Sequence, residues 1–184
     1  MLTEFFVFYR PKDIVSGDFY WYFEKNGFFY LCVADCTGHG VPGAFLTMLG
    51  TTFLNEIITS SDNLSPSVIL DKLRSKIIKS LSQSSDKGNK DGMDISLIRV
   101  NTENNTAEWS GAYNPLIILR PKNVAELSTK SKVNLLVSES HRLFEIKADK
   151  QPISISEKMS TFTNHEIQLE KGDNIYLFSD GYSD

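Results

Sequence analysis

The sequence is poor in several features, and each scarcity excludes a class of protein. Cys32 and Cys36 are its only cysteines, too few for a disulfide framework or a structural zinc site, and they fit a reducing cytoplasm. Its 19 basic residues are outnumbered by 23 acidic ones, and a net charge of -4 disfavours a nucleic-acid partner. No apolar run approaches the ~18 residues of a membrane span, and no signal peptide precedes the first strand-like segment. We therefore expect a cytoplasmic chain without direct membrane insertion.

The order of the expected elements indicates the fold class. The 184 residues suggest one domain over 1–184. Aromatic and β-branched runs at 4–11, 17–24 and 28–35 predict strands, and two helices are expected after Val41 and after Ser65, which is placed to cap the second one. Strand-like segments then follow at 93–100, 106–112, 115–121, 133–137, 142–147 and 165–180. Because strands and helices are segregated rather than alternating, the pattern predicts an α+β fold with antiparallel sheet.

The first helix is expected to bury a single apolar stripe. Its apolar residues recur at helical spacing: Val41, Phe45, Leu46, Leu49, Phe53, Leu54, Ile57 and Ile58. Gly50 lies within the helix, where glycine costs roughly 1 kcal/mol relative to alanine. Close packing of the helix on the sheet is the expected reason for this glycine.

A predicted hairpin brings two aspartates together. Asn26-Gly27 is a strong turn signal between the second and third runs. Asp18 stands eight residues before Asn26, and Asp35 stands eight after Gly27, so the two carboxylates are expected to face each other across the strands. Like charges in that position repel unless a cation lies between them.

Asp180 shares this setting, since all three aspartates stand at the edge of an apolar strand and close to glycine. A carboxylate there is unfavourable unless it is paired, hydrogen-bonded or bound to metal. All-oxygen ligands favour a hard divalent cation, Mg²⁺ or Mn²⁺. The alternative is that each aspartate caps a turn or helix, and Asp35 in particular could cap the helix that starts at Val41.

His39, in the glycine-rich loop "GHGVPG", has two interpretations. It could be a metal ligand or a general acid, or a hydrogen-bonded packing residue of the turn. The loop is not a P-loop, because the "GK[ST]" ending is missing. Cys36 is expected in the same loop, where its backbone carbonyl matters more than its thiol.

The motifs resemble one family over nearly the whole chain. "DIVSGDFYW", "VADCTGHGVPGAFLTMLG", "DGMDISLI", "SGAYNPLIILR", "DKQPI" and "KGDNIYLFSDGYSD" occur in this order. The chain resembles a SpoIIE-type bacterial member of the PPM (type 2C-like) metal-dependent serine/threonine phosphatases. The resemblance implies an α-β-β-α sandwich of two antiparallel sheets flanked by helices.

The resemblance also implies a site with two Mn²⁺ or Mg²⁺ ions. Asp18 then corresponds to a ligand of one metal, Asp35 to the bridging ligand with the carbonyl of Cys36 as its partner, and Asp180 to a ligand of the other metal. These aspartates are the expected catalytic residues. His39, Asp94 and Asp184 are secondary candidates. The implied reaction is attack of a metal-bridged hydroxide on phosphoserine or phosphothreonine.

The implied partner is a phosphorylated signalling protein of a partner-switching system, such as a STAS-type anti-sigma-factor antagonist. An upstream sensor domain is expected in the full-length protein, and a homodimer is left open. The chain departs from the family in two ways. Ser154 stands where the family often has glycine, and the usual C-terminal helix and last strand, with a further aspartate ligand, are absent from 1–184. An alternative is therefore a catalytically weak or inactive phosphatase-like domain that regulates or binds a partner.

Overall fold

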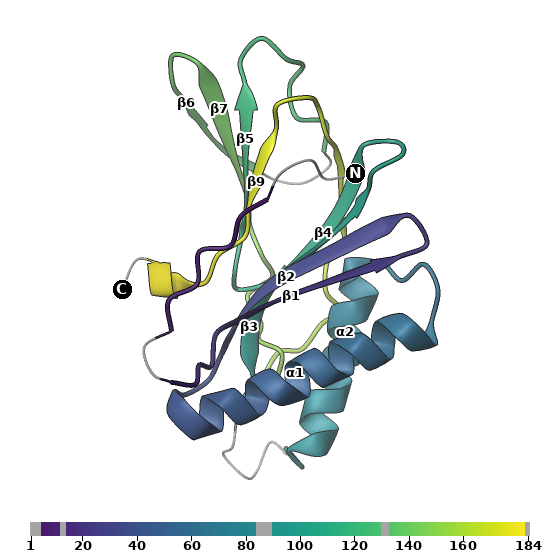
Figure 1. The fold of residues 1–184 in the computed structure, drawn as a ribbon, viewed down its shortest axis with the longest axis vertical. Helices are drawn as coiled ribbons and strands as arrows, with labels where there is room; N and C mark the ends of the chain where they lie inside the picture. The colour runs from purple at the N-terminus through teal and green to yellow at the C-terminus, as the bar shows by residue number, and fades with distance from the viewer. Residues whose placement is uncertain (1–4, 12–13, 84–89, 130–132, 183–184) are drawn as a thin grey trace.

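The protein folds into two antiparallel sheets with two helices on one side (Figure 1). The computed structural model describes residues 5–11, 14–83, 90–129 and 133–182. The five-stranded sheet has the order β1-β2-β3-β4-β8 and the four-stranded sheet the order β6-β7-β5-β9. The elements are β1 (Phe19–Lys25), β2 (Phe28–Cys36), α1 (Gly40–Ser60), α2 (Pro66–Ser80), β3 (Met93–Asn101), β4 (Thr106–Ala112), β5 (Leu116–Pro121), β6 (Val133–Val137), β7 (His141–Ile146), β8 (His165–Gln168), β9 (Asn174–Tyr176) and a 3-10 turn, η1 (Asp180–Tyr182).

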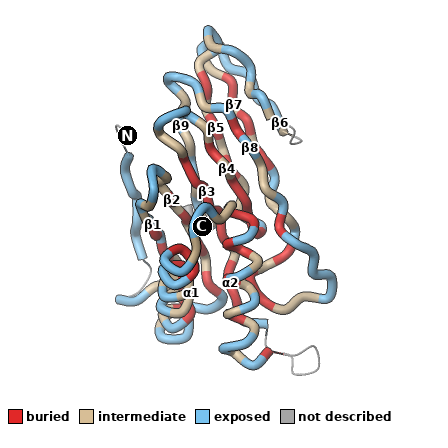
Figure 2. Tube along the Cα trace, turned by 90° about the vertical axis from the view of Figure 1, so that its right-hand side faces the viewer, coloured by how far each residue is buried: buried red, intermediate tan, exposed pale blue. Residues whose placement is uncertain are grey.

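Two hydrophobic cores separate three layers. One core lies between the helices and the five-stranded sheet and includes Trp21, Leu54 and Leu97. The other lies between the sheets and includes Trp109 and Phe144. Figure 2 shows the buried residues concentrated along these inner faces. The α+β class and the sandwich of two antiparallel sheets are confirmed; in the described part of the chain, helices cover only the outer face of the five-stranded sheet.

The hairpin forms in the predicted register. Asn26 and Gly27 take positive φ angles of 52° and 79°, as the tight turn requires. The ladder pairs Phe19 with Ala34, so its next step places Asp18 opposite Asp35.

The segment expected to be the first strand is not one. Described residues 5–11 form no ladder. Instead their aromatic rings lie on the outer surface of the hairpin, with Phe5 6.3 Å from Phe29 and Tyr9 5.9 Å from Tyr20 between ring centroids. Side-chain packing, rather than backbone pairing, holds this segment.

Helix α1 buries most of the predicted stripe, but not its first two members. Its buried positions are Gly43, Leu46, Gly50, Leu54, Ile57 and Ile58, whereas Val41 and Phe45 are 77% and 55% exposed. The glycines explain how closely the helix approaches the sheet. A Cβ on Gly50 would lie 3.0 Å from Met93 Cε and 3.1 Å from Phe19 Cζ, so the helix approaches the sheet along its glycines. The expected role of Gly50 is confirmed, and the inclusion of Val41 and Phe45 in the buried stripe is wrong.

By length and composition alone, α1 could cross a membrane. Among the residues that the structure describes, it is the one helix with this property. The sequence reasoning overlooked this property. In the fold, however, its inner face packs on the five-stranded sheet, as buried helices that pass the same test do. Helix α2 begins at Pro66 as expected, but the Ser65 hydroxyl contacts Ser67 Oγ at 3.1 Å and does not cap the helix backbone.

Candidate carboxylate site

The structure brings three predicted aspartates together at one end of the five-stranded sheet. Asp18 immediately precedes β1, Asp35 is the penultimate residue of β2, and Asp180 begins η1. Asp18 and Asp180 both lie close enough to the Asp35 carboxyl group to raise its pKa. Asp94 is paired with Asp35 in the ladder between β2 and β3. Segments far apart in sequence therefore meet here, and Figure 1 shows η1 beside the N-terminal segment.

The carboxyl groups hold a proton more tightly than isolated ones. Burial, followed by the hydrogen bonding and negative charges of Asp18 and then Asp180, raises the pKa of Asp35 to about 8. Burial, followed by the charge of Asp180, raises the pKa of Asp94 to about 6. A hydrogen bond between two carboxyl groups requires a proton on one of them. The same oxygens could instead face a cation, which would relieve the repulsion without a proton.

Neighbouring polar groups orient Asp18. The Ser179 hydroxyl donates a hydrogen bond to Asp18 Oδ2 at 2.7 Å, and the Asp18 amide donates to Ser16 Oγ at 3.0 Å. A Cβ on Gly181 would lie 3.2 Å from the same Oδ2. The sequence reasoning missed Ser179, although its position next to Asp180 could have suggested a supporting role.

Two glycines let the backbone segments around the site approach closely. A Cβ on Gly43 would lie 2.6 Å from the carbonyl oxygen of Gly38, and one on Gly17 would lie 2.8 Å from the same oxygen. The loop after β2 is thus held between the N-terminal turn of α1 and the segment that carries Asp18. Because no side chain fits at Gly17 or Gly43 without moving this loop, both positions require glycine.

Thr47, which the sequence reasoning also missed, ties α1 to the site. Its hydroxyl lies 3.1 Å from the Ser16 carbonyl oxygen and 2.9 Å from that of Gly17, and donates to them. Its Oγ1 is also 3.9 Å from the Cys36 sulfur. The helix therefore contacts the backbone that precedes Asp18 and the side chain that follows Asp35, and no sequence motif indicates these contacts.

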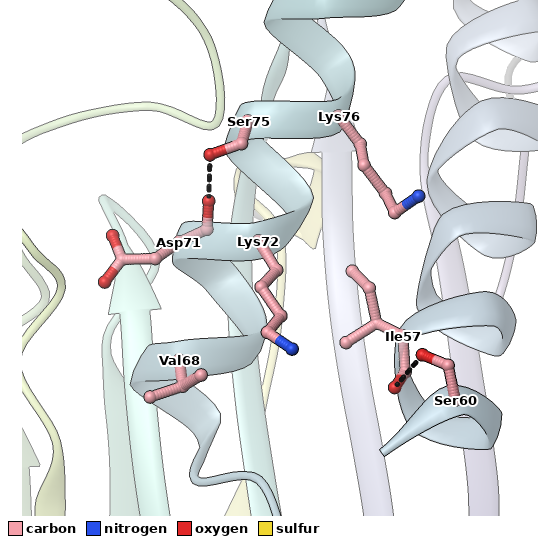
Figure 3. A pocket seen from close by; sticks show the side chains of 7 residues that line it. All are labelled: Ile57, Ser60, Val68, Asp71, Lys72, Ser75 and Lys76. Carbon is pink, nitrogen blue, oxygen red and sulfur yellow. Dashed lines mark hydrogen bonds between the residues drawn. The ribbon is translucent and has the colours of Figure 1, made fainter.

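A small cavity of about 220 Å³ opens beside the carboxylates. It is lined by Asp35, Cys36, Thr37, Gly38, Met93, Asp94 and Pro152. A larger hollow of about 420 Å³ lies between α1 and α2 (Figure 3). There Lys76 extends toward α1, while the Asp71 carboxylate points away from the hollow and pairs with Arg74 at 2.8 Å. The cavity beside Asp35 is therefore the one associated with clustered carboxyl groups.

The structure places the remaining predicted residues in different parts of the fold. His39 is the exposed N-cap of α1 without a side-chain cap hydrogen bond. The capping alternative for Asp35 is therefore wrong, because Asp35 lies within β2. Cys36 is not in the loop but ends β2, where burial raises the pKa of its thiol to about 12. Asp184 lies outside the described residues.

The roles of Asp18, Asp35, Cys36 and Asp180 as catalytic or metal-binding groups stay predictions. Among the residues that the structure describes, no group of three or more His, Cys, Asp or Glu side chains has the arrangement of a ready metal site. Asp18 and Asp180 nevertheless both act on the Asp35 carboxyl group and raise its pKa. The oxygen donors are of the type that hard cations prefer.

Comparisons with known proteins identify the family. The family model described as Stage II sporulation protein E (SpoIIE) matches residues 25–184. None of the curated protein sequences is similar enough to this chain to count as a relative.

Solved structures agree on the fold. The SiaA-PP2C domain of Pseudomonas aeruginosa has a TM-score of 0.74 and 26% identity; the match covers 96% of this chain and 61% of that one. The PP2C phosphatase domain of SpoIIE from Bacillus subtilis, solved with a fragment of its regulatory domain, has a TM-score of 0.65 and 18% identity, with 92% and 41% covered. RsbX in complex with magnesium has a TM-score of 0.60 and 18% identity, with 92% and 69% covered. This chain therefore belongs to the SpoIIE family and has the fold of PP2C-type phosphatase domains.

Proposed function

We propose that this chain is a serine/threonine protein phosphatase that depends on Mn²⁺ or Mg²⁺. Its substrate is a phosphoserine or phosphothreonine on a bacterial signalling protein, with a STAS-type anti-sigma-factor antagonist as the specific candidate. The observation that carries the proposal is the Asp35 carboxyl group, placed between Asp18 and Asp180 and beside a cavity. Family membership supports phosphatase activity in general.

The donor set fits hard divalent cations. Asp18, Asp35 and Asp180, with the backbone carbonyl of Cys36, would hold the ions, Asp35 being the ligand common to both. Asp18 and Asp180 raise the pKa of Asp35, so a cation placed among these carboxyl groups would relieve the same repulsion that a proton relieves. When bound, two such ions supply charge neutralisation of the phosphate and a nucleophile at neutral pH.

The chain's own residues position the donors and the substrate. Ser179 fixes one oxygen of Asp18 by a hydrogen bond. Gly17 and Gly43 hold the loop after β2, whose Thr37 and Gly38 line the cavity beside Asp35. His39, four residues after Asp35, and Asp94, the ladder partner of Asp35, are the candidates for protonating the leaving seryl oxygen.

The test is Mn²⁺-dependent dephosphorylation of a phosphoserine-bearing STAS domain and of p-nitrophenyl phosphate. Asp35→Asn is expected to abolish both activities. Asp62→Asn is the matched control, because Asp62 is an exposed aspartate paired with Lys25 at the far end of the hairpin. Turnover by Asp35→Asn equal to that of the unmodified chain would refute the proposal. Binding of the STAS domain without Mn²⁺-dependent turnover would favour the alternative, a phosphatase-like binding domain.

We also propose that the chain acts in the cytoplasm, downstream of a sensor domain in the full-length protein. The matched SpoIIE structure includes a fragment of a regulatory domain, which supports such an arrangement. Phosphatase assays of the full-length protein, with and without an upstream region, test whether that region changes the rate.

A further inference from the structure

An exposed apolar surface adjoins the carboxylate site. It comprises Val41, Phe45 and Met48 on α1, and Ile14 and Val15 in the segment before Asp18, and we call it the apolar rim. Val41, Phe45 and Met48 recur at helical spacing, so they share the face of α1 that is turned away from the sheet. Figure 2 shows that this outer side of α1 is largely exposed.

The two parts of the apolar rim are attached to the site and to each other. Val41 lies six residues after Asp35, and Val15 lies three residues before Asp18. Thr47 of α1 donates hydrogen bonds to the carbonyls of Ser16 and Gly17, so the segment that carries Ile14 and Val15 is joined to the helix directly after Val15. A molecule that reaches the carboxylates over this end of α1 therefore meets the apolar rim.

The apolar rim also lacks charge. From Cys36 to Asn55 the sequence contains no Asp, Glu, Lys or Arg. Helix α1 thus presents apolar side chains to solvent without a neighbouring ionic group on its first four turns. Contiguous exposed apolar groups beside a functional site are typical of interaction surfaces.

We propose that the apolar rim is the docking surface for the phosphoprotein substrate, an inference that rests on the proposed function. It selects a folded partner whose phosphorylated residue is flanked by apolar side chains. The phosphate supplies the negative charge that the cation-loaded site requires, and the uncharged rim adds contacts that do not depend on charge. A small phosphoester occupies the cavity of about 220 Å³ but is too short to cover α1 as well.

The experiment compares a large and a small substrate. For Phe45→Ser, and separately for Val41→Ser combined with Met48→Ser, we expect kcat/KM for the phosphoserine STAS domain to fall about tenfold or more, mainly through KM. With p-nitrophenyl phosphate we expect a change of less than twofold. Leu136→Ser is the matched control, because Leu136 is equally exposed, at 68% against 67% for Met48, but lies on β6 at the opposite end of the molecule (Figure 1).

Several results would overturn the inference while leaving the phosphatase function standing. Unchanged turnover of the STAS domain by both rim variants is one. An equal loss with both substrates is another, because it would indicate a structural role. Sedimentation showing a dimer that Phe45→Ser dissociates, with turnover of the STAS domain unchanged, would assign the surface to self-association instead. If the unmodified chain hydrolyses neither substrate, the proposed function fails and the docking inference falls with it.

Discussion

Asp35→Asn is expected to stabilise the metal-free protein. Burial and the neighbouring aspartates raise the pKa of Asp35 from its ordinary value of 3.8 to about 8. Each pKa unit corresponds to about 1.4 kcal/mol, so this rise gives a ceiling of roughly 6 kcal/mol for the effect of ionising Asp35 in the folded chain. Asp35 is partly exposed, and solvent screening reduces the effect. We expect Asp35→Asn to raise the free energy of unfolding by about 1–2 kcal/mol at pH 8.

The expected gain in stability has a defined dependence on pH. Because the folded-state pKa lies above the unfolded one, the contribution of Asp35 to stability is fully present below pH 4 and is lost as the pH rises toward 8. The asparagine variant carries no such charge. Its advantage over the unmodified chain should therefore be smallest near pH 4 and grow up to pH 8.

Thermal unfolding in EDTA, followed by circular dichroism between pH 4 and pH 8, measures this difference. For a chain of this length, 1–2 kcal/mol corresponds to a rise in Tm of about 3–6 °C. Asp62→Asn is the control of opposite sign, because the Lys25 hydrogen bond lowers the pKa of Asp62. An Asp35→Asn variant that is less stable at pH 8, or whose advantage does not change with pH, would refute the electrostatic account of the site.

Other consequences can be tested in the same assays. Mn²⁺ should raise the Tm of the unmodified chain at pH 8 and raise that of Asp35→Asn much less; equal shifts in differential scanning fluorimetry would place the ion elsewhere. Gly43→Ala should lower stability although alanine favours helices by about 1 kcal/mol, because its Cβ would lie 2.6 Å from the Gly38 oxygen; a higher Tm would contradict that contact. Ser179→Ala should reduce Mn²⁺-dependent turnover about tenfold while Ser179→Thr retains more of it, since the hydroxyl orients Asp18; equal activity of both variants would exclude this role.

The hairpin and its aspartates could be predicted because the signals are local. Asn26 and Gly27 fix the turn, and counting along two regular strands then places Asp18 opposite Asp35. Strand length and turn position fully determine this pairing. The position of Asp180 was harder to predict, because Asp180 comes from the far end of the chain. Its place at a strand edge only suggested that it shares the environment of Asp18 and Asp35.

The supporting contacts could not be predicted, because they join segments whose relative position only the tertiary fold defines. Thr47 reads as an ordinary position of a helix, and nothing in the sequence relates its hydroxyl to the carbonyls of Ser16 and Gly17. The strand predicted at the N-terminal segment, described over residues 5–11, was wrong for a related reason. Its composition favours a strand, but strand formation also needs a partner edge, and its rings pack on the hairpin instead.

The prediction for α1 was wrong at Val41 and Phe45, for an instructive reason. Hydrophobic periodicity assigns bulky apolar residues to the core, yet a helix that approaches a sheet closely does so along its small residues, and here Gly43 and Gly50 mark the buried side. Val41 and Phe45 are consequently turned outward. Local rules fail most often where function imposes another requirement. This chain departs from them at mutually repelling aspartates and at an exposed apolar helix face, and both departures lie where the loop after β2 joins α1, which supports assigning the phosphate and its protein carrier to that same end of the molecule.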